Sequence, residues 1–538
     1  MPMARTPNAY DVIVVGAGFA GLYALHKLRG QGLSVRVFEA ADGVGGTWHW
    51  NRYPGARVDV ESQEYSYSFS EDLELEWTWS ERYASQPELL RYLNHVADRF
   101  DLRRDIELNT RVTAATFDEA TNHWTLTTDR GARASARYVV MATGCLSAPK
   151  EIDRPGVSAF KGETYATSSW PHEGVDFTGK RVAVIGTGSS AIQSIPQIAR
   201  QAAQVFVFQR TPNYTIPAHN GPLEHAARED WLANREENRQ RQRTSLLGVI
   251  YAAAPDTPFS QSGENERRDV LEGRWAQGGL CMYGLFPDLI VDPVANASAR
   301  DFVAEKIRDI VKDPDVADKL VPRSYAIGTK RLCVDTGYYE AFNRANVRLI
   351  DLKATPLDRI TPDGIRTNAE SFAVDAIVFA IGFDAMTGAL SRIDVRGREG
   401  QTLKSAWDAG PRTYLGLMVA GFPNLFTITG PGSPSVLSNM VVSIEQHVDW
   451  IASLLAYMAP FGLKTVEPTL DAQNGWVDHV NEISSMTLFP QANSWYVGAN
   501  VPGKPRVFMP YIGGVGAYRD LCAAVAANGY MGFKLRAA

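Results

Sequence analysis

Short apolar runs, separated by glycine-rich turns and helix-like stretches, recur along this chain. Residues 11–15 (Asp-Val-Ile-Val-Val) and 35–38 (Val-Arg-Val-Phe) are typical of parallel strands that are buried on both faces. A glycine-rich turn and a helix-like run over residues 21–28 lie between them, so the three segments predict a strand–helix–strand unit. Residues 181–185 and 205–208 begin and end a second unit of the same kind.

Other segments extend this α/β pattern. Residues 125–135 alternate between apolar and polar positions, which predicts antiparallel strands. Residues 138–141 and 375–379 again have the pattern of buried strands, and residues 430–434 (Gly-Pro-Gly-Ser-Pro) predict a rigid loop.

The pattern changes between residues 221 and 320. Charged, helix-like stretches cover residues 224–243 and 301–312. In the second stretch, apolar side chains recur on one helical face, at Val303, Ile307 and Ile310. We interpret this region as a helical insertion in the α/β pattern.

Composition narrows the classes of function. The chain has 538 residues, 45% hydrophobic and 21% charged, which is typical of a globular protein with several structural units. A net charge of −6 gives no reason to expect nucleic acid or an anionic membrane as a partner, and nothing implies a protein partner. We find neither a membrane-spanning apolar run nor a signal peptide at the N-terminus, so we expect a cytoplasmic protein. The four cysteines form no CxxC pair and the nine histidines no HExxH motif, so we expect neither a disulfide framework nor a metal site.

The first glycine-rich turn fits a dinucleotide-binding motif. It reads Gly16-Ala-Gly18-Phe-Ala-Gly21, follows a predicted strand and opens a predicted helix. Such glycines allow a tight turn, a close approach to a pyrophosphate and close packing of helix on strand. Glu39, at the end of the second strand, is suited to bind a ribose 2′-hydroxyl.

The second turn, Gly186-Thr-Gly188-Ser-Ser-Ala191, is the GxGxxA version of that motif. Its second strand ends in Gln-Arg210-Thr211, where no acid is present. A carboxylate there would repel a 2′-phosphate, whereas Arg210 can pair with it, so the motif favours NADP over NAD. The alternative for Arg210 is a solvated surface charge. Two dinucleotide sites suggest electron transfer between nucleotides; disulfide reductases also have two, but they need a cysteine pair that this chain lacks.

Residues 45–59 carry a more specific pattern. The stretch Gly45-Gly46-Thr-Trp48-His-Trp-Asn-Arg-Tyr53-Pro-Gly55-Ala-Arg-Val-Asp59 resembles the GGxWxxxxYPGxxxD motif of Baeyer–Villiger monooxygenases, flavin enzymes that convert ketones to esters or lactones. Further matches occur along nearly the whole chain, and the loop after Gly430 resembles the phenylacetone and steroid monooxygenase branch. Two positions depart from the family: Ala166 replaces the histidine of the FxGxxxHxxxWP fingerprint, and Ile381 replaces a threonine.

The resemblance implies an α/β fold with two Rossmann-like domains, one for FAD and one for NADP, and a helical insertion. The FAD-binding domain would comprise residues 1–147 and 384–538. The NADP-binding domain would comprise residues 148–220 and 326–383, and the insertion residues 221–325.

The resemblance also implies a reaction and its residues. NADPH would reduce FAD, O₂ would add to form a flavin peroxide, and the deprotonated peroxide would attack a ketone. Arg331 matches the arginine of the active site and Asp59 the acid that orients it; arginine suits this position because it does not lose its proton. Lys330, with Arg210, matches the residues that hold the 2′-phosphate, and Trp495 matches a tryptophan that contacts the nucleotide.

Several alternatives stay open. Asp59 could be a turn-stabilising acid and Arg331 an ordinary surface charge, and the aromatic residues Trp48, Trp50 and Tyr53 could be core aromatics. Cys333, beside Arg331, is expected to be a small buried residue and not a nucleophile. At the level of function, the alternatives are a flavin oxygenase that acts on nitrogen or sulfur, and an uncoupled NADPH oxidase-like flavoprotein in which the changes at Ala166 and Ile381 have removed oxygenation.

Overall fold

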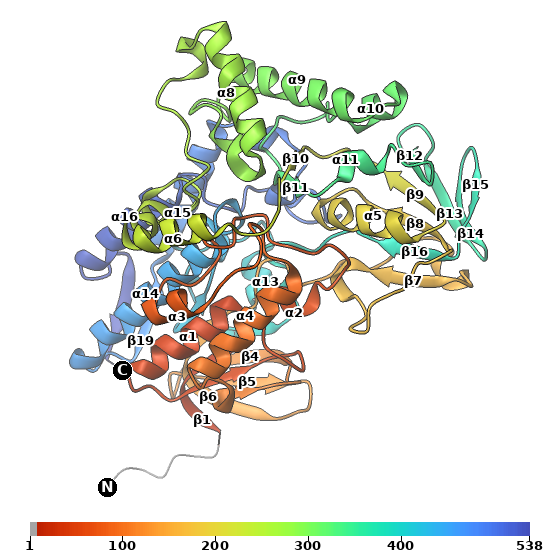
Figure 1. Ribbon diagram of the computed structural model, residues 1–538. Coiled ribbons are helices and arrows are strands. Elements are labelled where there is room, and N and C mark those ends of the chain that lie inside the picture. Colours follow the sequence, from red (N-terminus) through yellow and green to blue (C-terminus); the bar gives the residue numbers. More distant parts are fainter. Residues whose placement is uncertain (1–7, 538) are drawn as a thin grey trace.

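A computed structural model describes residues 8–537, and in it the two glycine-rich turns belong to two separate sheets (Figure 1). Residues 1–7, on which part of the signal-peptide prediction rests, lie outside the described residues. In Figure 1 the first sheet lies at the bottom, the second at the right, and most helices of the predicted insertion at the top.

The first sheet is mixed. Its strands follow one another in the order β17 (Asp394–Arg396), β4 (Val112–Asp118), β5 (His123–Thr128), β6 (Arg133–Met141), β1 (Ala9–Val15), β2 (Val35–Phe38) and β3 (Ile106–Glu107), with β18 (Leu425–Thr427) also paired to β6. Strand β1 is parallel to both β2 and β6, and β5 is antiparallel to β4 and β6. The predicted parallel strands at residues 11–15 and 35–38 and the predicted antiparallel strands near residues 125–135 are therefore confirmed. Strands from both ends of the chain share this sheet.

Helices from both ends of the chain also cover it. Tyr23 of α1 (Phe19–Gly30) donates a hydrogen bond to Asp449 of α14 (Met440–Met458) over 2.7 Å. The remaining helices of these two parts are α2 (Thr47–Trp50), α3 (Glu71–Glu76), α4 (Gln86–Arg99), α12 (Gly388–Ser391), α13 (Leu403–Ala406), α15 (Leu470–Ser485) and α16 (Val515–Ala527). A short antiparallel pair, β19 (Thr465–Pro468) and β20 (Phe533–Arg536), completes the C-terminal part.

The second sheet is entirely parallel. Its order is β12 (Val347–Asp351), β9 (Gln204–Gln209), β8 (Arg181–Ile185), β16 (Ala376–Phe379) and β7 (Glu163–Ala166). Helix α5 (Ser189–Gln201) connects β8 to β9, and α11 (Tyr338–Ala341) precedes β12. An antiparallel group, β13 (Leu357–Thr361), β14 (Gly364–Thr367) and β15 (Ser371–Ala373), lies between β12 and β16 in the sequence. All five strands end at the same edge, which positions the residues that follow them.

The insertion is helical, as predicted. It comprises α6 (His225–Ala233), α7 (Arg235–Thr244), α8 (Glu264–Gln277), α9 (Pro293–Ile310) and α10 (Pro314–Leu320). The predicted stretch 224–243 forms two helices, because Asn234 leaves helical geometry and its side chain bonds to Asp230 instead. On α9, Val303 and Ile307 are fully buried.

The two ends of the insertion are held together. Strand β10 (Thr215–Pro217) precedes it, β11 (Cys333–Asp335) follows it, and the two pair in parallel with Thr215 opposite Cys333. On this topology we propose the five-segment division predicted above as the domain organisation.

Single-turn helices connect many of these elements. They are η1 (Arg103–Asp105), η2 (Val157–Ala159), η3 (Thr167–Ser169), η4 (Phe259–Gln261), η5 (Gly279–Gly284), η6 (Arg398–Gly400), η7 (Ser435–Leu437), η8 (Ala459–Phe461), η9 (Phe489–Gln491) and η10 (Trp495–Val497). Two of them, η5 and η10, belong to segments that surround the candidate site below.

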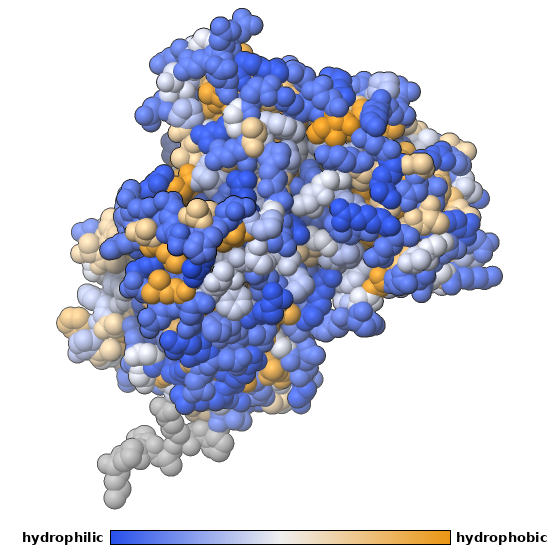
Figure 2. Space-filling model, in the orientation of Figure 1, coloured by the Kyte–Doolittle hydropathy of each residue, from blue (hydrophilic) through white to orange (hydrophobic). Residues whose placement is uncertain are grey.

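The surface in Figure 2 is largely hydrophilic, with apolar side chains scattered over it. Among residues 8–537, no helix has the length and apolar character needed to cross a membrane. The same described residues contain no cluster of histidine, cysteine and acidic side chains suited to a metal ion. All four cysteines are buried and unpaired.

Candidate active site

The first glycine motif forms a backbone cradle at the start of α1. A Cβ atom on Gly18 would lie 3.3 Å from the Cα of Gly46, and one on Gly16 would lie 2.5 Å from the carbonyl oxygen of Ala142. No side chain caps α1, and its first turn has no acid. The free N–H groups and positive end of the helix therefore suit a pyrophosphate, and the predicted FAD residues Gly16, Gly18 and Gly46 fit that group. Gly21 serves packing, since a Cβ there would lie 1.8 Å from the oxygen of Gly16.

Glu39 lies directly beside this cradle. Its carboxylate accepts hydrogen bonds from the N–H groups of Ala17 (2.6 Å) and Ala41 (2.8 Å). Burial raises the pKa of Glu39, while these two N–H groups oppose the shift. Carboxylate oxygens accept more than one hydrogen bond each, so Glu39 holds the loop and keeps capacity for a ribose hydroxyl.

The second motif is built in the same way. A Cβ on Gly186 would lie 2.4 Å from the carbonyl oxygen of Ala380, whereas one on Gly188 would point into open space. Helix α5 begins after Gly188 with no side-chain cap and no acid in its first turn. The geometry therefore leaves room for a second pyrophosphate at this helix.

Positive side chains gather beside this second motif. Parallel pairing of β9 and β12 places Gln209 opposite Asp351, so Arg210 and Thr211 leave the sheet next to the segment that carries Lys353. Half-buried Lys330 has its pKa lowered to about 8, first by burial and then by the charges of Arg210 and Lys353. Its ammonium lies 4.2 Å from the centre of the Tyr325 ring. A cluster of mutually repelling cations suits an anion such as a 2′-phosphate.

Arg331, the neighbour of Lys330, forms a bidentate ion pair with Asp59. Its Nε donates to Oδ2 over 2.8 Å and its Nη2 to Oδ1 over 2.9 Å, while Nη1 donates to the carbonyl oxygen of Val436 over 3.1 Å. Burial opposes the charge of Arg331, but Asp59 more than offsets it, so the net pKa of Arg331 is raised and the side chain stays charged. This paired, half-buried arrangement agrees with the predicted roles of Arg331 and Asp59 better than with a free surface charge or an acid that only stabilises a turn.

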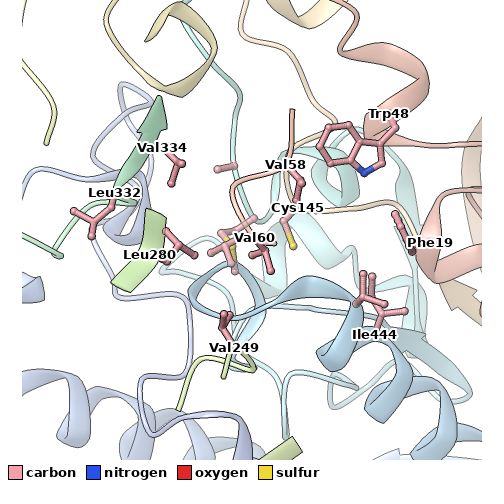
Figure 3. Close-up of a cluster of buried hydrophobic side chains, with 14 of the residues drawn as sticks. Phe19, Trp48, Val58, Val60, Cys145, Val249, Leu280, Leu332, Val334 and Ile444 are labelled. Carbon is pink, nitrogen blue, oxygen red and sulfur yellow. The ribbon is translucent and has the colours of Figure 1, made fainter. Parts of the chain in front are cut away.

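Buried apolar side chains flank Asp59 of this ion pair. Asp59 stands between Val58 and Val60, which are 3% and 1% exposed, whereas the side chains of Arg331 and Asp59 are 17% and 30% exposed. Figure 3 shows both valines with Trp48 on one side and Leu332 and Leu280 on the other. Leu332 follows Arg331 in the sequence, and Leu280 belongs to the insertion. Partial exclusion of water strengthens the electrostatic interaction of the pair.

The Tyr53–Asp59 stretch bridges the two nucleotide-binding units. Tyr53 donates a hydrogen bond to Gln193 of α5 over 2.9 Å, and Gln193 donates to the carbonyl oxygen of Arg57 over 3.1 Å. Gly55 has a φ of 82°, and a Cβ there would lie 2.3 Å from the carbonyl oxygen of Gln193. This contact explains why the pattern needs tyrosine and glycine: it docks the chain onto α5 and thereby positions Asp59.

The other predicted residues lie around this centre. Trp48 is buried and packs edge-on against Tyr65, with ring centres 5.9 Å apart. Trp495 is half-buried and packs on Tyr496, whose phenol is among the groups that influence the pKa of Arg331. Cys333 is buried and burial raises its pKa to about 12, which agrees with a packing role.

Comparisons with known proteins place the chain in a family. Residues 13–223 match the family model described as pyridine nucleotide-disulphide oxidoreductase. A Baeyer–Villiger monooxygenase from Pseudooceanicola batsensis is 44% identical over 97% of this chain and 95% of its own length. A solved steroid monooxygenase bound to NADP is 54% identical, with a TM-score of 0.95 and coverage of 98% of this chain and 100% of that one. A phenazine N-monooxygenase from Lysobacter antibioticus is 41% identical over 98% of this chain and 97% of its own length.

The chain belongs to the Baeyer–Villiger monooxygenase family. The comparisons confirm the predicted family and fold class, and with the family the enzyme class, a monooxygenase that depends on FAD and NADPH. The match to the disulphide oxidoreductase model reflects the nucleotide-binding architecture, since the buried cysteines of this chain form no redox pair.

Ala166, which replaces the histidine of the family fingerprint, lies in the second sheet. It is the last residue of β7, in register with Phe379 of β16, so it belongs to the second sheet and ends at its nucleotide-facing edge. The next residue, Thr167, lies 3.1 Å from Ser190 at the start of α5 through their hydroxyl oxygens.

Four residues of the site escaped the sequence analysis. They are Lys353 in the cation cluster, Gln193 under Tyr53, and Tyr283 and Asn296 of the insertion, which hold the segment before Arg331. Only Lys353 had a usable signal, because it follows a strand-like run at residues 347–351.

Proposed function

We propose that this chain oxidises ketones to esters or lactones with FAD, NADPH and O₂, and that Arg331 and Asp59 form its reaction centre. In the overall reaction one oxygen atom of O₂ enters the bond between the carbonyl carbon and a neighbouring carbon. NADPH and a proton reduce the other atom to water. Bound FAD supplies the redox chemistry that activates O₂.

The observation that carries the proposal is the half-buried, bidentate Arg331–Asp59 pair. Oxygen transfer to a carbonyl develops negative charge on oxygen, and a fixed cation in a water-poor site stabilises that charge. Asp59 holds two of the guanidinium N–H groups and keeps the cation in place, while Val436 takes a third. The remaining N–H groups of Arg331 are available to an oxygen anion.

The nucleotide proposal follows from the two cradles. Gly16, Gly18, Gly46 and Glu39 would hold FAD, with Trp48 beside them. Gly186, Gly188, Arg210, Thr211 and Lys330 would hold NADPH, and Trp495 would contact it. Repulsion among the cations at the second site makes a 2′-phosphate the favoured occupant, since an uncharged ribose would leave that repulsion in place. The predicted cytoplasmic location stays a prediction.

Oxygenation of nitrogen or sulfur is the second candidate. A relative that is 41% identical over nearly all of this chain is a phenazine N-monooxygenase, so overall similarity does not separate the two reactions. Attack by a nitrogen or sulfur atom needs a protonated, electrophilic oxidant and gains nothing from a permanent cation beside it. The half-buried arginine, held in place by Asp59, therefore favours ketone oxidation.

A product assay tests the proposal. The FAD-loaded protein is incubated with NADPH, O₂ and a panel of aryl, cyclic and steroid ketones, together with a tertiary amine and a thioether. Ester or lactone, N-oxide or S-oxide, hydrogen peroxide and consumed NADPH are measured in each sample. Ester or lactone formation supports the proposal, whereas N- or S-oxides without any ester, or hydrogen peroxide alone, would contradict it.

A further inference from the structure

The short segment that carries Lys330 and Arg331 has little backbone pairing of its own. It follows a turn in which Thr329 bonds to Ala326, and β11 begins only at Cys333, whose N–H donates to the carbonyl oxygen of Tyr214 over 3.0 Å. Buried backbone groups in such a segment need partners from elsewhere, because leaving them unpaired is costly.

The helical insertion supplies those partners. The Tyr283 hydroxyl, from η5, donates to the carbonyl oxygen of Lys330 over 3.3 Å and accepts the N–H of Leu332 over 3.1 Å. One hydroxyl thus bridges the two peptide groups on either side of Arg331. Burial raises the pKa of Tyr283 to about 12, so the hydroxyl keeps the proton that it donates.

A second side chain of the insertion anchors the same segment upstream. Asn296 of α9 donates to the carbonyl oxygen of Ile327 over 2.9 Å and accepts its N–H over 2.9 Å. The side-chain amide of Asn296 thus pairs with both backbone groups of Ile327, as a neighbouring strand would. Asn296 therefore fixes the start of the segment, and Tyr283 fixes the part that carries the two cations.

The two cations beside this bridge serve different sites. Lys330 lies over Tyr325 in the cation cluster, whereas Arg331 reaches Asp59. Any shift of the backbone between them would displace both side chains at once. We propose that Tyr283 is a positioning residue that holds Lys330 at the nucleotide and Arg331 at the reaction centre through its single hydroxyl.

This inference rests on the proposed roles of Lys330 and Arg331 and gives the insertion a definite task. The hydroxyl of the buried Tyr414, in contrast, makes a single hydrogen bond, to the carbonyl oxygen of Met531 over 3.1 Å. Losing such a hydroxyl affects stability only. Losing the Tyr283 hydroxyl leaves both peptide groups that flank Arg331 without the partner that they share.

The variant Tyr283→Phe tests the inference, because it keeps the ring and removes the hydroxyl. Displacement of a positioned group by about 1 Å costs up to about a hundredfold in rate, so we expect ester formation per consumed NADPH to fall about tenfold. The KM for NADPH should rise about fivefold with little change in the KM for NADH, since the displaced Lys330 acts on the 2′-phosphate alone. All rates are expressed per bound FAD, measured by flavin absorbance, so loss of folded protein does not enter.

Tyr414→Phe is the matched control, and Arg331→Ala separates two kinds of failure. Tyr414→Phe removes one hydrogen bond where Tyr283→Phe removes two, so it should lower Tm no more than Tyr283→Phe does, and it should leave coupling and the ratio of the two KM values unchanged. If Tyr283→Phe behaves like Tyr414→Phe while Arg331→Ala abolishes ester formation, this inference alone is overturned. If Arg331→Ala still forms ester, the proposed role of Arg331 fails, and the inference fails with it.

Discussion

The charge state of Lys330 should make the affinity for NADPH or NADP⁺ depend on pH, whereas the affinity for NADH or NAD⁺ should not. Burial and the charges of Arg210 and Lys353 lower the pKa of Lys330 from 10.5 to about 8. Each pKa unit corresponds to about 1.4 kcal/mol, so keeping Lys330 charged in the free protein costs roughly 3 kcal/mol. A bound 2′-phosphate, doubly charged above pH 7, offsets this cost and raises the pKa again.

The sign of the effect follows from that shift. Below pH 8 Lys330 is charged before the nucleotide binds, and affinity is independent of pH. Above pH 8 the free protein has a neutral Lys330, so binding must take up one proton. The Kd for NADP⁺ should then rise with pH, approaching tenfold per unit, until the pKa of the complex is reached.

Titrations of NADP⁺ and NAD⁺ between pH 6.5 and 9.5 measure this difference. We expect the NADP⁺ curve to bend near pH 8 and the NAD⁺ curve to stay flat over the same range. Lys330→Arg is the control, because arginine stays charged and should bind NADP⁺ with no bend. Parallel curves for both nucleotides would refute the assignment of Lys330 to the 2′-phosphate.

Three further variants test other parts of the site. Arg331→Ala should keep FAD bound and lose ester formation, because the developing oxygen anion loses its cation; retained ester would contradict the role. Gly55→Ala should lower stability by about 3 kcal/mol, since its φ of 82° and the 2.3 Å approach of a Cβ to Gln193 are both unfavourable; an unchanged Tm would exclude this docking contact. Ala166→His should increase the ester formed per NADPH consumed, because an imidazole can donate and accept hydrogen bonds at this edge of the second sheet and an alanine side chain cannot. Activity that appears only in the variant would mean that the natural chain is inactive.

The parts of the fold that the sequence predicted are those encoded locally. Two glycines spaced two residues apart, between an apolar run and a helix-like run, strongly indicate a turn from a strand into a helix. Both dinucleotide motifs occur at such turns, before α1 and before α5. The buried strands were visible because both of their faces are covered, which removes polar positions from the run. Where neighbouring segments decide the outcome, the sequence carries no local signal: Ala166 lies in a strand because β16 pairs with it, and nothing in the four residues of β7 shows that.

The same distinction separates the residues of the site. Arg331 and Asp59 were predicted only through resemblance, because 272 positions separate them in the chain and no local pattern joins them. Tyr283 carried no signal at all, since a tyrosine in a helical insertion is by default a core aromatic. Its importance comes from two backbone groups of a distant segment that need a donor and an acceptor at the same point. Positioning residues of this kind make hydrogen bonds to backbone groups of a distant segment. Every residue type has the same backbone groups, so the sequence of that segment does not show that it needs such a partner.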